Sequence, residues 1–200
     1  MKDSPNTPVV ILSGGLSRRF GSNKALARLD GERLIDQLIA RLANQTSGPI
    51  VVNAPDEDSY GLPAIQFVED EVGDKLGPLA GIHAAISWAE QHGYESVCTT
   101  PVDTPFVPTN YVSSMTSLRG PVIASFAGKY HPIHGAWPVT LKDSLEAGIT
   151  AGMRAVMSWV DTIDATVLDF SNSCDADPFI NINRPADITL LEQGDHAARS

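Results

Sequence analysis

The side chains best suited to chemistry near the start of the chain follow a pair of glycines. Gly14 and Gly15 are followed, within ten residues, by three cations: Arg18, Arg19 and Lys24. Glycine lets the backbone approach a ligand closely, and the N–H groups of such a loop can form a concave anion site. Guanidinium and ammonium groups add the fixed positive charge that a polyphosphate requires. The segment therefore predicts a phosphate-binding loop.

The alternative interpretation is an ordinary strand-to-helix turn, in which Gly and Ser are common. The spacing matches neither Gly-x-x-x-x-Gly-Lys-Ser/Thr nor the dinucleotide-binding Gly-x-Gly-x-x-Gly. It reads Gly-Gly-x-x-x-Arg-x-Gly-x-x-Lys, with Gly21 as the third glycine, and this longer pattern is rarer than either standard motif. The rarity favours a phosphate site over a simple turn.

A single carboxylate with rigid flanks is the second candidate. Asp103 stands between Pro101 and Pro105, and proline fixes φ, so the carboxylate is expected to be held in place. A fixed carboxylate opposite a cationic loop suits a Mg²⁺ ion that bridges protein and polyphosphate. The alternative is that Asp103 merely caps a helix beginning near Pro108.

Two further polar positions follow other expected strands. Asn53 could hydrogen-bond a base or ribose, or could simply form an Asx-turn. Asp70 lies in an acidic run, 69–71, which offers a second acidic strand end but is more typical of a charged surface. Asn181 and Asn183 alternate around Ile182, so both side chains are expected on one face of an extended segment.

Composition limits the function classes. Two hundred residues suit one domain spanning 1–200, and no run approaches the length of a membrane span. The net charge of −10 makes nucleic acid and anionic membranes poor partners. Residues 1–45 nevertheless hold seven Lys or Arg against four Asp or Glu. This cationic end of an acidic chain indicates a site for a small anion.

The remaining composition indicates a cytoplasmic protein. The first residues lack the apolar region of a signal peptide. Cys98 and Cys174 are too few for a disulfide framework and have no metal-ligand spacing.

Strands and helices are expected to alternate along the chain. Hydrophobic periodicity and turn residues predict strands over 8–13, 49–53, 64–68, 96–100, 121–126, 130–137, 165–170 and 179–183. They predict helices over 32–45, 79–91, 108–118, 139–148, 153–160 and 185–192. This order predicts a Rossmann-like three-layer α/β/α sandwich with a mostly parallel central sheet. Ligands bind such sheets beyond the carboxyl ends of their strands, where the polar segments described above fall.

Six segments in the same order resemble the molybdenum cofactor guanylyltransferases, the MobA type of nucleotidyltransferase. The loop 12–24 is similar to the family's Leu-Ala-Gly-Gly with its following Arg, Gly and Lys, and residues 51–53 and 68–70 resemble the ends of its second and third strands. Residues 77–81 read Gly-Pro-Leu-Ala-Gly, residues 101–105 resemble Pro-Cys-Asp-x-Pro, and residues 179–185 resemble Phe-x-Asn-x-Asn-x-Pro. Ser13 and Val102 depart from the family's Ala and Cys, and Asn23 stands where Asp is often found.

The resemblance implies transfer of GMP from GTP to molybdopterin, with release of pyrophosphate and with Mg²⁺ as cofactor. It implies catalytic roles for Arg19, Lys24 and Asp103, with Asp103 as the metal ligand. It implies a nucleotide site on the N-terminal half, formed by Leu12, Ser13, Gly14, Gly15, Lys24, Asn53, Asp70, Gly77, Pro78, Leu79 and Asp103. Asn181 and Asn183, on the C-terminal half, would face the pterin. Other cofactor-biosynthesis proteins or acceptor molybdoenzymes are possible partners.

Two other functions stay open at this point. The loop is also similar to that of cytidylyl-transferring relatives, which usually carry Ala at the position of Gly15 and lack Gly-Pro-Leu-Ala-Gly. A non-catalytic nucleotide-binding relative is disfavoured because such a protein could lose the carboxylate of Asp103. His131 and His134 have no clustered acidic partner in the sequence, so they are interpreted as packing or pocket-lining residues rather than a metal pair.

Overall fold

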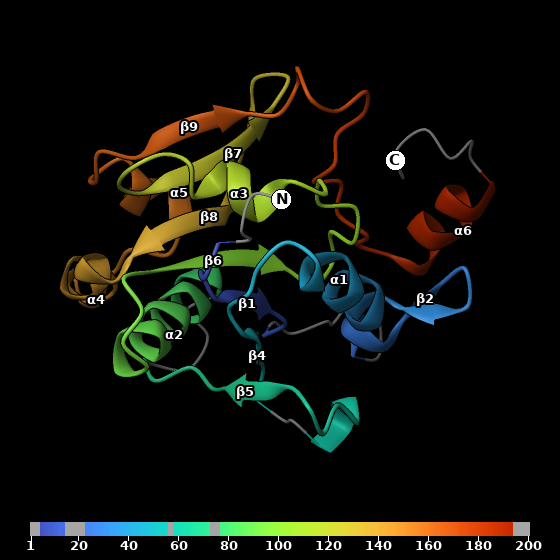
Figure 1. The fold of residues 1–200 in the computed structure, drawn as a ribbon, viewed down its shortest axis with the longest axis horizontal. Helices are drawn as coiled ribbons and strands as arrows, with labels where there is room; N and C mark the ends of the chain where they lie inside the picture. Colours follow the sequence, from blue (N-terminus) through green and yellow to red (C-terminus); the bar gives the residue numbers. More distant parts are fainter. Residues whose placement is uncertain (1–4, 15–22, 56–57, 73–76, 194–200) are drawn as a thin grey trace.

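The computed structural model describes residues 5–14, 23–55, 58–72 and 77–193. Its centre is a seven-stranded sheet in the order β5-β4-β1-β6-β8-β7-β9. The strands are β1 (Val9–Leu12), β4 (Ile50–Asn53), β5 (Gln66–Val68), β6 (Ser96–Pro101), β7 (Val122–Phe126), β8 (Lys129–Pro138) and β9 (Thr166–Asp169). Figure 1 shows them in this order from β9 at the top to β5 at the bottom.

All strand pairs of this sheet are parallel except those that β8 makes with β6 and β7. The sequence prediction of a mostly parallel sheet is therefore confirmed. The reversed direction of β8 has a consequence for the site. Its first residues and the turn that joins it to β7 lie at the edge where β1, β4 and β6 end.

Helices cover both faces of the sheet. They are α1 (Leu34–Ala43), α2 (Pro78–Gln91), α3 (Tyr111–Met115), α4 (Lys142–Thr150), α5 (Val156–Val160) and α6 (Pro185–Gln193), with short 3₁₀ turns η1 (Lys24–Leu26), η2 (Asp58–Tyr60) and η3 (Val139–Leu141). On β1, Val9 and Ile11 pack with residues of α1 and α3, whereas Val10 and Leu12 pack with residues of α2, α4 and α5. Successive side chains of a strand point to opposite faces, so this alternation creates the three layers that were predicted.

Four sequence predictions of elements need correction, among them the helix expected over 153–160, which is only the five residues of α5. The helix expected from residue 32 begins at Leu34, because Glu32 and Arg33 form β3 and pair with β2 (Arg28–Leu29) in a small antiparallel ribbon. The helix expected over 108–118 is only the five residues of α3. The strand expected over 179–183 is absent, and that segment has no regular structure.

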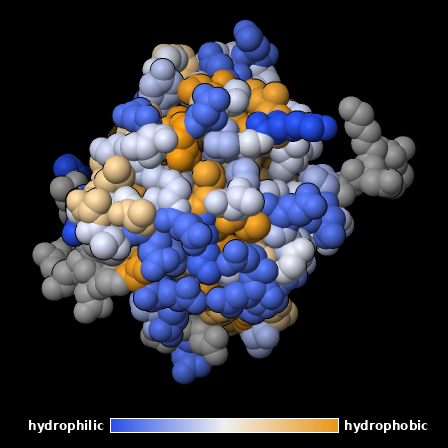
Figure 2. Space-filling model, turned by 90° about the vertical axis from the view of Figure 1, so that its left-hand side faces the viewer, coloured by the Kyte–Doolittle hydropathy of each residue, from blue (hydrophilic) through white to orange (hydrophobic). Residues whose placement is uncertain are grey.

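The left-hand side of the molecule, where α4 lies, carries mainly hydrophilic side chains with smaller apolar areas between them (Figures 1 and 2). This side is where β6 begins and β8 ends, away from the edge that gathers the predicted site residues. In the parts of the chain that the structure describes, no helix is long and apolar enough to cross a membrane.

Candidate active site

A pocket of about 420 Å³ lies at the carboxyl edge of the sheet. Strand β1 ends at its wall, and five other segments contribute to it. The lining consists of residues 12–14, 23–25, Pro78, 101–103, 129–134 and Asn181. Most segments predicted from sequence to carry the chemistry therefore share one cavity.

Lys24 occupies the centre of the polar contacts in this pocket. Its Nζ donates to Asp103 Oδ2 at 2.7 Å and to Asn183 Oδ1 at 3.1 Å. Lys24 is placed there because it opens η1, whose first turn is capped by Asn23 Oδ1 accepting from the N–H of Ala25. Residues far apart in the sequence thus meet at one ammonium group.

The chain around Asp103 is fixed by backbone hydrogen bonds. Val102 N donates to Leu12 O at 3.0 Å, which extends the pairing of β6 with β1 by one residue. Ile182 N donates to Asp103 O at 2.9 Å, which brings the C-terminal segment to the site. The alternative role of Asp103 as a helix cap is wrong, because α3 begins only at Tyr111 and follows Asn110.

The second carboxylate oxygen of Asp103 indicates room for a cation. Asp103 Oδ1 is buried and has no hydrogen-bond partner among the described residues. An unsatisfied buried oxygen is costly, whereas a hard cation would satisfy it. The described part of the chain holds no cluster of three His, Cys, Asp or Glu residues that could form a complete metal cage. This donor set fits Mg²⁺, which usually keeps waters and substrate phosphates beside one or two carboxylates.

Asn53 and Asp70 form a second polar unit next to the glycine loop. Asn53 Nδ2 donates to Asp70 Oδ1 at 2.9 Å and to the carbonyl of Val68 at 3.2 Å. These two hydrogen bonds join the ends of β4 and β5. Neither is the Asx-turn that the sequence left open as an alternative role for Asn53. Asn53 is 2% exposed, and a Cβ placed on Gly14 would lie 3.4 Å from its Oδ1. The pair is thus positioned beside the point where the loop leaves β1.

The start of α2 provides a different kind of wall. Gly77 has φ +64°, a conformation that favours glycine, and Pro78 occupies the first helical turn, where its missing N–H costs little. The N-terminus of this helix is a partially positive end that suits an anion. Leu79 is fully buried in the core and does not line the pocket, so of the predicted residues Gly77, Pro78 and Leu79 only Pro78 reaches the cavity.

Four residues of the predicted phosphate loop, Gly15, Arg18, Arg19 and Gly21, lie outside the described residues, so their roles stay predictions. The two asparagines near the C-terminus are described and differ from each other. Asn181 lines the pocket, whereas Asn183 contacts Lys24. Ile182 between them is buried, although the segment is not a strand.

The segment at the start of β8 lines the pocket, as was expected for its two histidines. His134 Nδ1 lies 3.1 Å from Thr100 Oγ1, and burial holds the pKa of His134 well below its usual value. The pKa of His131 is lowered mainly by burial, and its Nε2 lies 3.5 Å from Asp177 Oδ1. Sequence reasoning missed Asp177, because the acidic partner comes from a distant loop. It also missed Lys129 and Tyr130 as pocket residues.

Comparisons with known proteins show the family of the chain. The family model described as "MobA-like NTP transferase domain" matches residues 9–165. A protein of Rhizobium rhizogenes named molybdenum cofactor guanylyltransferase is 36% identical over 204 residues, covering 96% of this chain and 93% of that protein. A protein of the same name from Yersinia pestis is 34% identical over 193 residues, covering 94% of this chain and 96% of its own length.

Solved structures agree in fold. The crystal structure of molybdopterin-guanine dinucleotide biosynthesis protein A from Archaeoglobus fulgidus has a TM-score of 0.74 at 23% identity, covering 94% of this chain and 97% of that one. The structure of 4-diphosphocytidyl-2C-methyl-D-erythritol synthase from Anaerococcus prevotii has a TM-score of 0.71 at 13% identity, with coverage of 94% and 95%. At these identities the likeness concerns the fold alone.

Proposed function

The chain belongs to the family of MobA-like NTP transferases, and from this premise we propose that it transfers GMP from GTP to molybdopterin with release of pyrophosphate. Curated relatives at 34–37% identity over nearly the full length of the chain carry the name molybdenum cofactor guanylyltransferase. The cytidylyl alternative is not favoured, since relatives at 34–37% identity carry the guanylyl name, whereas a structure with a cytidylyl name is 13% identical.

The observation that carries the proposal is the meeting of three segments in one pocket. Gly14, Lys24 and Asp103 come from the glycine loop, η1 and the end of β6, and all line the same cavity. A nucleotidyltransferase needs a backbone cradle, a cation and a carboxylate around one polyphosphate, and these residues offer all three.

The reaction requires little covalent help from the protein. An oxygen of the terminal phosphate of molybdopterin attacks the α-phosphorus of GTP and forms a new P–O bond. The bond between the α-phosphorus and the bridging oxygen breaks, and pyrophosphate leaves with the electron pair. Positioning and charge neutralisation supply most of the rate in such transfers. Lys24 and the loop amides hold the triphosphate, Arg19 stabilises charge on the transferred or leaving phosphates, and Asn53 with Asp70 orients the nucleoside.

Members of this family typically use a divalent metal. We assign this role to Mg²⁺ and its protein ligand to Asp103, because the buried Oδ1 has no other partner among the described residues. When bound, the ion supplies Lewis-acid stabilisation of phosphate charge. The proposal requires the Lys24–Asp103 ion pair to rearrange, so that the ammonium contacts phosphate and the carboxylate contacts the cation.

The two halves of the chain take different substrates in this proposal. The N-terminal half binds GTP, and the C-terminal half, with Asn181, binds molybdopterin. Both halves line one pocket, which supports treating residues 1–200 as a single domain. Other proteins of cofactor biosynthesis or acceptor molybdoenzymes would receive the product.

The experiment that tests the function measures pyrophosphate release by the purified chain with GTP, molybdopterin and Mg²⁺. Omission of molybdopterin or of Mg²⁺ should abolish the release. A thermal-shift series with GTP, CTP, ATP and UTP is the matching binding test, since a ligand at 100 times its Kd stabilises a fold by about 2.7 kcal/mol. Absence of both pyrophosphate release and a GTP-dependent shift would reject the proposal.

A further inference from the structure

The hairpin formed by β7 and β8 places an aromatic residue at the pocket. Tyr130 lines the cavity, yet 53% of its surface is exposed, which is unusual for an aromatic residue on a strand. Its neighbour His131 also lines the cavity but is only 7% exposed. We call Tyr130 and His131 the hairpin wall. Neither residue has a role in the proposal above.

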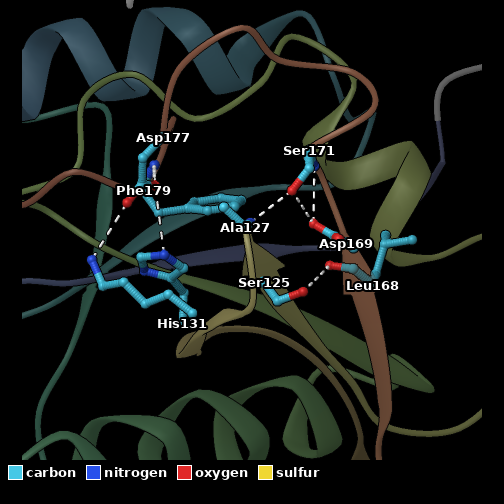
Figure 3. Close-up of polar contacts among 9 residues, drawn as sticks. Ser125, Ala127, His131, Leu168, Asp169, Ser171, Asp177 and Phe179 are labelled. Carbon is cyan, nitrogen blue, oxygen red and sulfur yellow. Dashed lines mark hydrogen bonds and ion pairs between the residues drawn. The ribbon is translucent and has the colours of Figure 1, made fainter.

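The hairpin wall is held firmly from two sides. At the turn, Ala127 N donates to Ser171 Oγ at 2.6 Å, and Ser171 in turn donates to Asp169 Oδ1 (Figure 3). On the other side, Asp177 contacts His131 and Lys129, the residue that precedes the wall. Its Oδ2 lies 3.4 Å from Lys129 Nζ and its Oδ1 lies 3.5 Å from His131 Nε2 (Figure 3). Such anchoring suits a surface that binds a ligand in one orientation.

The ring nitrogens of His131 indicate what the wall offers. Nε2 is buried and faces the carboxylate of Asp177, which favours the tautomer with its proton on Nε2. Nδ1 then carries a lone pair. Nδ1 has no hydrogen-bond partner among the described residues. Unlike Nε2, it is not fully buried, so a ligand can reach it. Burial lowers the pKa of His131, so the ring is neutral at pH 7 and Nδ1 can accept a hydrogen bond.

These properties fit a flat heteroaromatic ligand with an N–H edge. An aromatic face stacks on a planar ring, and every heteroaromatic base has such a π-face. An acceptor nitrogen beside it pairs with a ring or amino N–H of the ligand. Both guanine and the pterin ring of the acceptor have such an edge.

The position of the wall decides between these two sources. The polar unit of Asn53 and Asp70 lies on the side of β1 that faces β4 and β5. The hairpin wall belongs to β8, on the opposite side of β6 from β1. Asp103 lies two residues after the end of β6, between the two. An acceptor phosphate that reaches the α-phosphate near Asp103 therefore leaves its ring system on the hairpin side.

Building on the proposed function, we propose that the hairpin wall binds the pterin ring of the acceptor, with Tyr130 stacking on the ring and His131 Nδ1 accepting a hydrogen bond from its N–H edge. Asp177 is a positioning residue, because it holds His131 and Lys129, which line the pocket, and does not line the pocket itself. The nucleotide base has no contact with this wall.

The test compares KM values for molybdopterin and for GTP in the pyrophosphate-release assay. We expect Tyr130→Leu and His131→Phe each to raise the KM for molybdopterin about tenfold, which corresponds to about 1.4 kcal/mol. The KM for GTP and the GTP-dependent thermal shift should stay within twofold of the wild type. Tyr130→Phe retains the stacking face and should recover most of the acceptor affinity.

Asp177 is tested by a conservative pair. Asp177→Asn keeps an oxygen that can accept from His131 Nε2, so its effect on the KM for molybdopterin should be smaller than that of Asp177→Leu. Leu118→Ala is the matched control, because Leu118 is an exposed apolar residue that precedes β7 at the opposite edge of the sheet.

The outcomes separate this inference from the proposed function. If the wild type releases pyrophosphate and the Tyr130 and His131 variants keep its KM for molybdopterin, the hairpin wall is not the acceptor surface. If the KM for GTP rises instead, the wall binds the base, and the inference is overturned in favour of guanine. If the wild type neither binds GTP nor turns over, the proposed function itself fails.

Discussion

The ammonium of Lys24 lies 2.7 Å from the carboxylate of Asp103, a residue 79 positions later in the chain. Both side chains are mostly buried, with 14% and 19% of their surfaces exposed. Two opposite charges at this distance stabilise each other in the absence of substrate. The same two charges are complementary to a polyphosphate and to a divalent cation, so the pair can exchange its internal contact for contacts with substrate.

We expect Asp103→Asn to abolish most of the turnover while leaving the fold intact. The substitution preserves size but removes the negative charge that is proposed to hold Mg²⁺. Loss of such electrostatic stabilisation typically lowers kcat by about 10²-fold or more. Pyrophosphate release is the measurement, and circular dichroism checks the fold.

The control for this substitution is Asp143→Asn, an exposed carboxylate in the first turn of α4. This substitution also removes one negative charge, but away from the pocket. The Asp143→Asn variant should therefore have the turnover of the wild type. Wild-type turnover by a folded Asp103→Asn variant would contradict the metal assignment.

The parts of the fold that were predicted from sequence are those with strong local signals. One example is the β-branched run of β1, and another is the set of polar residues that follow the strands. From these signals Gly14, Asn53 and Asp103 were correctly predicted to lie at one edge of the sheet. The pairing of Asp177 with His131 could not be predicted, because it joins a loop to a strand through tertiary packing. The short ribbon of β2 and β3 was missed because each strand has only two residues and no alternation to detect.

The segment around Asn183 shows why the C-terminal prediction was wrong in detail. Alternating exposure of Asn181, Ile182 and Asn183 resembles the period of a strand. The backbone N–H of Ile182 instead bonds Asp103 O, and that of Asn183 bonds the side chain of Asp187. Capping contacts for α6 therefore replace strand pairing, a choice that periodicity cannot reveal.

GTP should bind much more tightly than CTP. Gly14 and the glycine-containing start of α2 leave backbone room for a purine, and a polar base edge left unpaired in a closed site is costly. We expect selectivity well beyond tenfold. Displacement of labelled GTP by each nucleotide measures it, and equal competition by CTP would support the cytidylyl alternative instead.

Asn181→Asp and Asn183→Asp should have different effects, because the two side chains make different contacts. Asp at position 183 would place a negative charge near Lys24 Nζ, to which Asn183 Oδ1 is now bonded. It should compete with triphosphate and weaken GTP binding severalfold. Asn181→Asp removes the side-chain amide donor at a residue that lines the pocket. It should raise the KM for molybdopterin and leave GTP binding unchanged. Equal loss of GTP affinity in both variants would show that the pair is structural.

Stability should fall as the pH drops below about 6.5, the ordinary pKa of histidine. Burial lowers the folded-state pKa of His83, His131 and His134, and most strongly that of His134. In this pH range the unfolded chain binds protons that the folded chain does not, so the free energy of unfolding decreases as pH falls. Each group contributes up to about 1.4 kcal/mol per pH unit until its folded-state pKa is reached.

The measurement is urea unfolding at pH 7.5 and pH 5.5 for the wild type and His134→Gln. The variant should lose less stability between the two pH values than the wild type loses, whatever its stability at pH 7.5. An equal or greater loss in the variant would mean that His134 does not titrate as described.

Gly81→Ala should weaken GTP binding although it improves the intrinsic helix propensity of α2 by about 1 kcal/mol. A Cβ at this position would lie 2.8 Å from Asn53 Oδ1 and 3.3 Å from a methyl carbon of Leu12. Asn53 is buried and tied to Asp70, so it cannot move without losing that bond. Overpacking of this kind costs about 1–3 kcal/mol, which is comparable to or larger than the gain.

Gly148→Ala in α4 is the matched control. A Cβ at position 148 would also lie close to a neighbour, 2.9 Å from the sulfur of Met153, but that side chain is flexible and can move away. We expect a severalfold rise in the Kd for GTP with Gly81→Ala and none with Gly148→Ala, measured by the GTP-dependent thermal shift. An unchanged Kd in Gly81→Ala would show that Asn53 does not need its present position to bind the nucleoside.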